Sequence, residues 1–473
     1  MHSYFLMPFN FITISPQKEI LINIVGDFLF LPKGTVKRIV ERKITLYNDS
    51  NLYQDLISNY IISETPIHPL IDVLATKYRT KKDFLSDFTG LHIFAITLRC
   101  DHKCDYCQVS RQSKDFLEFD MPHEVIDKSI ELMLKSPSNC LTMEFQGGEP
   151  LLVFDKIKYA IEKIKSKNHL FKKTIHYVIC TNLTHINNEI LQYCKENNIL
   201  LSCSLDGPEF IHNRNRNYPG KNSYKSAIEG IRKAQSFLGE DKISALMTTT
   251  TYSLSYPIEI INEYRRIGFK NIFLRPINPY GYALRTQKNR YTSTQFLNFY
   301  KEALRYILKL NIDGEFFVED YARIILKKIL TPFNVNFVDL QSPAGIITGV
   351  IVYNRDGKVY VSDEARMLGE MGDLTFQVGD VLKDSYEKVF YGEKASYLSN
   401  FILNESLAGC SICPFQMYCG ADPVHNYATQ RDLYGKRYSN AFCFRNKEII
   451  KFLFELIDSQ DGVFDIFKSW VIN

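Results

Sequence analysis

The sequence lacks a strong excess of either charge. Its 473 residues carry 57 lysines and arginines against 53 aspartates and glutamates, which leaves a formal net charge of +4 at pH 7. Proteins that bind nucleic acid through its phosphates gather basic residues on one face or in one run, so this small, dispersed excess predicts no nucleic-acid partner. The composition, 45% hydrophobic and 23% charged, is typical of a globular protein and excludes extended disorder.

A targeting signal and a long apolar run are also missing. No lysine or arginine precedes Lys18, and no small-residue cleavage site follows an apolar stretch. The most apolar early window, residues 20–32, contains Asp27 and is far shorter than the ~20 residues of a membrane-spanning helix. We therefore expect a cytoplasmic protein without a membrane partner.

Low-complexity linkers and solenoid repeats are absent too, so we expect closely packed domains, about three at roughly 150 residues each. Residues 1–88 are predicted to form a small α+β module that resembles a winged helix, with two strands joined around residues 25–27 and helices at 35–44 and 51–62. Residues 89–310 are predicted to form the core. Residues 311–473 should begin with a helix at 315–330 and a hairpin at 349–361, whose turn holds Asp356 and Gly357.

The core segment repeats one pattern six times: an apolar, β-rich run, a short polar loop and a stretch with helical periodicity. This repetition predicts an α/β fold with a partial, TIM-like (β/α)6 barrel and helices outside it. The chemistry of such barrels lies in the loops at the carboxyl ends of the strands. The predicted strands end at Cys100, Gly147, Asn182, Gly207, near Thr250 and at Pro276.

Eleven cysteines are present, an odd number that argues against a disulfide framework and for metal or redox chemistry. Cys140, Cys180, Cys194 and Cys203 lie in or beside apolar stretches, where a free thiol behaves as a small buried hydrophobe. The remaining seven are clustered and are candidate metal ligands: Cys100, Cys104, Cys107, Cys410, Cys413, Cys419 and Cys443.

The early cluster places three thiolates in one loop, which suits an iron–sulfur cluster with one iron left open; a zinc site or coincidental thiols are the alternatives. The motif CDHKCDYC, with Tyr106 before the last cysteine, resembles that of the radical S-adenosylmethionine (SAM) superfamily. The resemblance implies a [4Fe-4S] cluster whose open iron chelates SAM. Reductive cleavage of SAM would give a 5′-deoxyadenosyl radical, with an electron donor such as flavodoxin or ferredoxin.

Further motifs resemble the superfamily's SAM-binding positions. Two glycines after a strand allow close approach of a ligand, and a carboxylate can accept hydrogen bonds from an ammonium group. Within GGEP, the resemblance implies that Glu149 binds the SAM amino group; a plain turn is the alternative. The implied cofactor contacts are Tyr106, Gly147, Gly148, Glu149, Asn182, Ser204, Asp206 and Arg216. For Arg216 a solvated surface loop is the alternative, and Asn213 stands where relatives commonly carry aspartate.

The late cysteines, C-x2-C-x5-C followed by Cys443, can close the coordination of a metal site. They resemble the SPASM domain of radical SAM enzymes that act on peptides, which commonly carries two auxiliary clusters and seven cysteines. This chain has four, with Ser342, Ser362 and Pro423 near positions where relatives show cysteine. We therefore expect one auxiliary [4Fe-4S] cluster, with zinc as the alternative.

Over nearly its full length, including MPFNF, GDFLFL, FQGGEPLL and SDEARML, the chain resembles the His-Xaa-Ser system radical SAM maturases. This implies a ribosomally made precursor peptide, a second radical SAM maturase as a possible partner, and an N-terminal module that takes a leader peptide as an added strand or merely packs on the barrel. Asp363 falls where sulfatase-maturing relatives carry an acidic base, although an ion-paired role is the alternative. Sulfatase-maturase-like oxidation of one side chain and a zinc-stabilised scaffold are the alternative functions.

Overall fold

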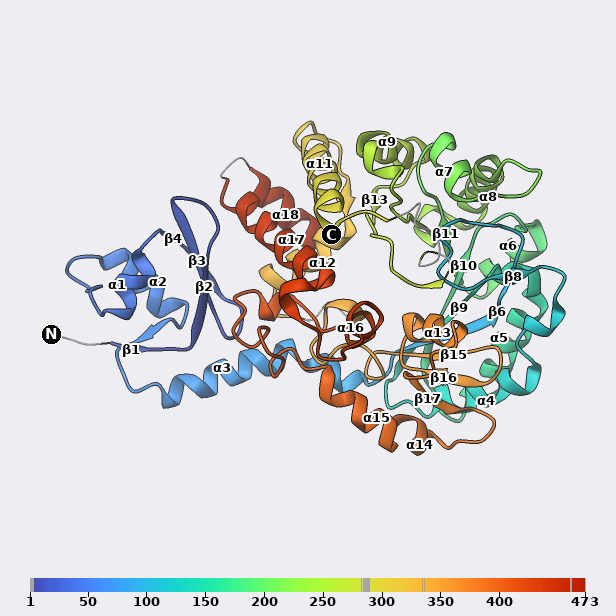
Figure 1. Cartoon of the computed structure of the whole chain (residues 1–473), viewed down its shortest axis with the longest axis horizontal. Helices are drawn as coiled ribbons and strands as arrows, with labels where there is room; N and C mark the ends of the chain where they lie inside the picture. Colours follow the sequence, from blue (N-terminus) through green and yellow to red (C-terminus); the bar gives the residue numbers. More distant parts are fainter. Residues whose placement is uncertain are drawn as a thin grey trace.

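The computed structural model describes residues 4–281, 283, 290–333, 335, 337–459 and 462–472. Its centre is an eight-stranded sheet in the order β12-β11-β10-β9-β6-β15-β16-β17 (Figure 1). The first five strands pair in parallel, which confirms the predicted α/β core. They are β6 (Leu91–Thr97), β9 (Cys140–Gly147), β10 (Thr174–Thr181), β11 (Leu200–Ser204) and β12 (Ile243–Leu246).

The sixth predicted strand is short and leaves the main sheet. β13 (Asn271–Ile272) pairs with β14 (Val318–Glu319), and a parallel bridge joins Thr249 to Pro276. Helices alternate with these strands because apolar residues recur every three or four positions; α5 buries Ile157, Ala160, Ile161 and Ile164. The helices of this region are α4 (His123–Leu134), α5 (Phe154–Asn168), α6 (Asn188–Glu196), α7 (Glu209–Asn215), α8 (Ser223–Leu238), α9 (Pro257–Ile267) and α11 (Ser293–Ile312).

The main sheet continues into residues beyond 310. The predicted hairpin forms β15 (Val350–Tyr353) and β16 (Lys358–Tyr360), and Gly357 adopts the positive φ of 87° that its turn requires. β15 pairs in parallel with β6, and β17 (Gln377–Asp380) pairs with β16. The C-terminal segment thereby builds one edge of the sheet, while the divisions at 88/89 and 310/311 stay predictions.

The predicted helix at 315–330 begins late. Residues 318–319 form β14 instead, and α12 (Asp320–Leu330) starts only where the Glu319 carboxylate accepts hydrogen bonds from the backbone N–H groups of Tyr321 and Ala322. The later helices are α13 (Asp363–Glu370), α14 (Tyr386–Tyr391), α15 (Glu393–Leu398), α16 (Pro423–Gln430), α17 (Ala441–Ile457) and α18 (Val463–Ile472). None of the helices described is long and apolar enough to cross a membrane.

The N-terminal residues form an antiparallel sheet of β2 (Phe9–Thr13), β3 (Lys18–Asn23) and β4 (Phe28–Pro32). The side chain of Asn23 accepts hydrogen bonds from the N–H groups of Val25 and Asp27, which shapes the turn between the two predicted strands. Both predicted helices end early, and residues 62–63, at the predicted end of the second helix, join a strand pair instead. The remaining elements are β1 (Phe5–Leu6), α1 (Thr35–Val40), α2 (Ser50–Ser58), β5 (Ile62–Ser63) and α3 (His68–Lys81).

One aromatic cluster attaches this sheet to the rest of the chain. Phe454 of α17 is fully buried, and its ring centroid lies 5.0 Å from that of Phe28 and 6.2 Å from that of Phe30. On its other sides it meets the rings of Phe415 and Tyr418, which belong to the segment of the second cysteine set. Figure 1 shows α17 and α18 beside the N-terminal sheet.

Replacing this ring should loosen the attachment. We expect Phe454→Ala to lower the free energy of unfolding by about 3–5 kcal/mol, the usual cost of removing a buried phenylalanine. Phe464→Ala on α18 is the control, since Phe464 is 37% exposed and should cost about 1 kcal/mol or less. Denaturant unfolding of both variants measures the difference, and equal stabilities would contradict the role given to Phe454.

Candidate functional site

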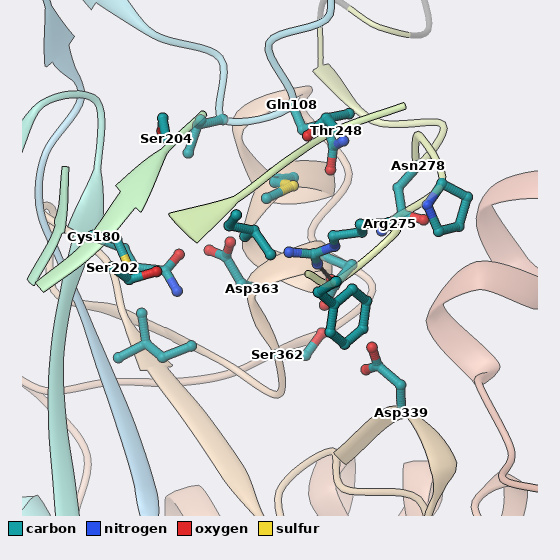
Figure 2. Close-up of a pocket in the computed structure, with 18 of the residues that line it drawn as sticks. Gln108, Cys180, Ser202, Ser204, Thr248, Arg275, Asn278, Asp339, Ser362 and Asp363 are labelled. Atoms are coloured by element: carbon teal, nitrogen blue, oxygen red, sulfur yellow. Dashed lines mark ion pairs between the residues drawn. The ribbon is translucent and has the colours of Figure 1, made fainter. Parts of the chain in front are cut away.

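A single cavity of about 590 Å³ lies at the carboxyl ends of the parallel strands. At one end it is lined by the early cysteine loop and by the ends of β9, β10 and β11. At the other end it is lined by residues from α13, α16 and α17. Figure 2 shows Cys180, Ser202 and Asp363 projecting into this space, with Arg275 and Asp339 on its far side. The cavity therefore joins the two parts of the chain that carry clustered cysteines.

Cys100, Cys104 and Cys107 all line the cavity. Burial raises the pKa of the Cys104 thiol to about 12, against the opposing charge of Arg216, so the thiolate needs further stabilisation, such as a metal. The three sulfur atoms are not all within 4.8 Å of one another. A tetrahedral zinc site would require separations of about 3.8 Å, so the three thiols as placed do not form a compact zinc site.

The two glycines of GGEP are required by the backbone around them. A Cβ on Gly147 would lie 2.0 Å from the carbonyl oxygen of Thr97, and one on Gly148 would lie 2.1 Å from that of Arg99. The N–H of Gly148 donates to the Thr97 carbonyl at 2.7 Å, and that of Glu149 donates to the Arg99 carbonyl at the same distance. These contacts fix the end of β9 against the chain that leads into Cys100, a requirement that the sequence analysis did not foresee.

Glu149 lines the cavity from a fully buried position. Its carboxylate accepts hydrogen bonds from Thr181 Oγ1 at 2.6 Å and from the backbone N–H groups of Leu151 and Asn182 at 3.0 and 2.8 Å. Burial raises its pKa to about 7, although these bonds favour the charged form. An ammonium group beside this carboxylate would restore its charge, which fits the amino group of SAM.

The Arg216 side chain is only 13% exposed and lies at the cysteine end of the cavity, which does not favour the alternative of a solvated surface loop. Its guanidinium pairs with Asp206 at 3.1 Å and lies 5.4 Å from the centre of the Tyr106 ring. Tyr106 donates to the same aspartate at 2.7 Å. Arg216 Nε has no partner among the described residues, although it is buried. This unused donor fits an anionic group such as the SAM carboxylate.

The sequence-predicted contacts differ in their placement. Asn182 and Ser204 line the cavity with Tyr106 and Arg216, whereas the fully buried Asp206 lies behind them and holds Tyr106 and Arg216 in place. Asp363, the first residue of α13, lines the cavity and accepts a 2.8 Å hydrogen bond from Arg366. Asp363 is therefore ion-paired and also lines the cavity.

Asp101 was missed by the sequence analysis. Its oxygens accept hydrogen bonds from Asn182 Nδ2 at 2.9 Å and Thr184 Oγ1 at 2.8 Å, and they lie 2.8 and 3.0 Å from the rings of His102 and His185. Burial opposes its charge, but these partners keep its pKa well below the usual range. Only its position inside the cysteine motif could have pointed to it. Asp101 ties the cysteine loop to the end of β10.

The late cysteines gather around η9 (Gln416–Tyr418) and the first turn of α17. Burial raises the pKa of the Cys419 thiol to about 12, with Lys328 opposing it. No three of the four late sulfur atoms, all of which are described, lie within 4.8 Å of one another, which is again wider than zinc requires.

The three residues that the resemblance compared with cysteines of relatives have other contacts. Ser342 donates a hydrogen bond to Glu405 in a smaller cavity, whereas Ser362 caps α13 and Pro423 begins α16. These separate settings favour one auxiliary site over two.

The packing of the GGEP glycines gives a direct test. Gly148→Ala should lower the free energy of unfolding by about 1–3 kcal/mol, because its methyl group would overlap the Arg99 carbonyl, and it should reduce iron retained by the protein. Gly90→Ala is the control, since its Cβ would lie 3.6 Å from the nearest atom, the Cys140 carbonyl oxygen. Thermal unfolding and iron analysis of both variants measure these effects. Equal stability and equal iron content in the two variants would contradict this packing.

Comparison with known proteins adds a family match and curated relatives. Residues 94–263 match the model of the radical SAM superfamily. An uncharacterised protein of Methanocaldococcus jannaschii is 29% identical over 188 residues, which is 40% of this chain and 62% of that protein. A cysteine-type anaerobic sulfatase-maturating enzyme of Clostridium perfringens is 25% identical over 304 residues, or 59% of this chain and 76% of the enzyme. The chain thus spans less than two thirds of the first of these relatives.

Two solved structures share the fold. The structure of native anSMEcpe with bound AdoMet superposes with a TM-score of 0.65 at 18% identity, covering 80% of this chain and 99% of that one. Streptococcus suis SuiB bound to the precursor peptide SuiA gives a TM-score of 0.54 at 14% identity, covering 93% and 99%. Radical SAM enzymes use a [4Fe-4S] cluster and SAM, and the SPASM-type relatives carry auxiliary clusters. Residues 94–263 thus match the radical SAM superfamily, and the parallel sheet agrees with the fold of these structures.

Proposed function

We propose that this enzyme uses SAM to modify a ribosomally made precursor peptide. The observation that carries the proposal is the cavity, which joins the cysteine end of the core to the C-terminal segment. Relatives support it: anSMEcpe binds a Cp18Cys peptide, and SuiB binds its precursor peptide SuiA. A peptide residue that enters from the C-terminal side would meet the cofactor inside one cavity.

Different residues at the cysteine end would hold the cluster and SAM. Cys100, Cys104 and Cys107 would hold three irons of a [4Fe-4S] cluster, which with bound SAM supplies a radical able to abstract hydrogen. Glu149 would accept hydrogen bonds from the SAM ammonium, and Arg216 would pair with its carboxylate. Gly147 and Gly148 set the distance between these groups, and Asn182 and Ser204 line the space for the remainder of SAM.

The late cysteines Cys410, Cys413, Cys419 and Cys443 would hold one auxiliary [4Fe-4S] cluster. Their sulfur atoms as placed do not form a compact zinc site. Because Cys443 lies in α17, the same helix whose Phe454 contacts the N-terminal sheet, metal binding here would also stabilise the fold.

The finer assignment is a His-Xaa-Ser-type precursor, with a second radical SAM maturase and a flavodoxin or ferredoxin as partners. In support, β2 pairs only with β3 among the described strands, so it offers an open edge to which a leader peptide can add as a strand. Phe11 on that strand is 53% exposed. We retain the three segments 1–88, 89–310 and 311–473 as proposed domains of leader recognition, radical chemistry and auxiliary cluster.

A second candidate is oxidation of one side chain, as in sulfatase maturation. It is favoured by Asp363, which lines the cavity and would accept the proton released when the substrate side chain is oxidised. Its bond to Arg366 holds the carboxylate in one orientation.

The two cysteine sets should be separable by mutation. We expect about eight irons per chain in the anaerobically reconstituted wild type and about four in Cys104→Ala and in Cys413→Ala. Only Cys104→Ala should abolish 5′-deoxyadenosine production without losing the fold, because its loop lies outside the barrel core. Undiminished 5′-deoxyadenosine in that variant would refute the cofactor assignment, and four irons with one zinc in the wild type would make the late site structural zinc.

Mass spectrometry tests the peptide substrate. A precursor peptide encoded beside the enzyme, co-expressed with it, should change in mass in the presence of wild-type enzyme and stay unchanged with Cys104→Ala. An unchanged peptide beside an enzyme that cleaves SAM would contradict the peptide assignment.

A further inference from the structure

The cavity end opposite the early cysteines is rich in carboxylates. Asp339 lies in η7 (Val338–Leu340), Glu364 in the first turn of α13, and Asp422 at the start of α16, and all three line the cavity. They come from segments far apart in the sequence, so no local sequence motif predicts that these carboxylates lie together. All three residues are half-buried, and this burial raises their pKa values, that of Glu364 to about 8 and that of Asp422 to about 7.

The described cations at this end do not balance the carboxylates. Arg275 lies 3.7 Å from Glu364, and Arg445 lines the same wall. Arg366 pairs with Asp363 through Nε, and its two terminal nitrogens have no partner among the described residues. Three carboxylates therefore face two guanidinium groups. Because the raised pKa values leave these carboxyl groups partly protonated near pH 7, a cation that binds among them would favour their charged form.

Two further polar groups at this end lack hydrogen-bond partners among the described residues. The atoms concerned are His425 Nε2 and Asn446 Nδ2. His425 and Asn446 line the cavity and are only 4% and 3% exposed. Burial lowers the pKa of His425 to about 3, so the ring is neutral. A buried polar atom without a hydrogen-bond partner lowers the stability of the folded protein by about 1–3 kcal/mol, and a bound molecule that supplies the partner can offset this loss.

The spacing of the carboxylates excludes a compact metal site. Among the described residues, the three carboxylates do not all bring an oxygen within 4.8 Å of one another. Three oxygen ligands on neighbouring positions around a divalent ion would lie about 3–4 Å apart, since each is about 2.0–2.6 Å from the metal. An extended organic cation can reach separated carboxylates, and its neighbouring carbonyl groups can accept from Asn446.

We propose that this end of the cavity, formed by Asp339, Glu364 and Asp422, binds a lysine or arginine side chain of the peptide substrate. Asn446 donates to a carbonyl of the same peptide, and His425 completes the polar wall. The inference rests on the proposed peptide substrate and adds the charge of a residue beside the modified one. Anchoring of this side chain fixes which neighbouring residue reaches the cysteine end of the cavity.

Short peptides test the charge preference. Fluorophore-labelled Gly-Gly-Xaa-Gly-Gly peptides with capped ends, in which Xaa is lysine, arginine, norleucine or glutamate, are titrated anaerobically with SAM-loaded holoenzyme, and binding is followed by anisotropy. We expect the lysine or arginine peptide to bind at least tenfold more tightly than the norleucine peptide, and the glutamate peptide to bind most weakly. This comparison uses only wild-type enzyme and so does not depend on a variant that folds.

Variants locate the site. Glu364→Gln and Asp339→Asn should each weaken binding of the cationic peptide at least fivefold and leave norleucine-peptide binding unchanged. Glu189→Gln is the matched control, because the Glu189 side chain is 75% exposed and pairs with Lys158 on the outer surface. Equal binding of the lysine, arginine and norleucine peptides, or cationic binding that resists both substitutions, would overturn the proposal. SAM cleavage by the wild type without peptide, measured as 5′-deoxyadenosine, reports separately on the proposed radical chemistry.

Discussion

The close contact between the end of β9 and the backbone before Cys100 is the constraint on which the site depends. Gly147 and Gly148 leave no room for a side chain against the carbonyl groups of Thr97 and Arg99, and two hydrogen bonds close the contact. The cysteine loop and Glu149 are therefore fixed relative to each other before any cofactor binds. Asp101 adds a second tie, from the cysteine loop to the end of β10.

Charge is distributed unevenly along the cavity. At the cysteine end, Arg216 lines the cavity with the three thiols, and its buried Nε has no hydrogen-bond partner among the described residues. This end therefore suits anionic groups. At the other end, Asp339, Glu364 and Asp422 outnumber the arginines beside them. One cavity with opposite preferences at its two ends can orient a cofactor and a peptide toward each other, since each is bound where its charge is complemented.

The sequence predicted the parts of the structure that local pattern controls. The six core strands and the turn at Gly357 followed from apolar runs and glycine chemistry, and the cysteine spacing pointed to the cavity wall. The late start of α12 was missed because pairing of β14 with β13 overrides the helical periodicity of residues 315–319. Asp101 and the carboxylates of the acidic end were missed because only tertiary packing brings them together.

The account makes one claim above all others: SAM binds directly beside the cluster of the early cysteines. Electron paramagnetic resonance of the reduced Cys413→Ala enzyme, in which the early cluster is observed alone, tests this claim most directly. Addition of SAM should change the g-values of that signal, because SAM would become a ligand of its open iron. A signal that is identical with and without saturating SAM would contradict the account.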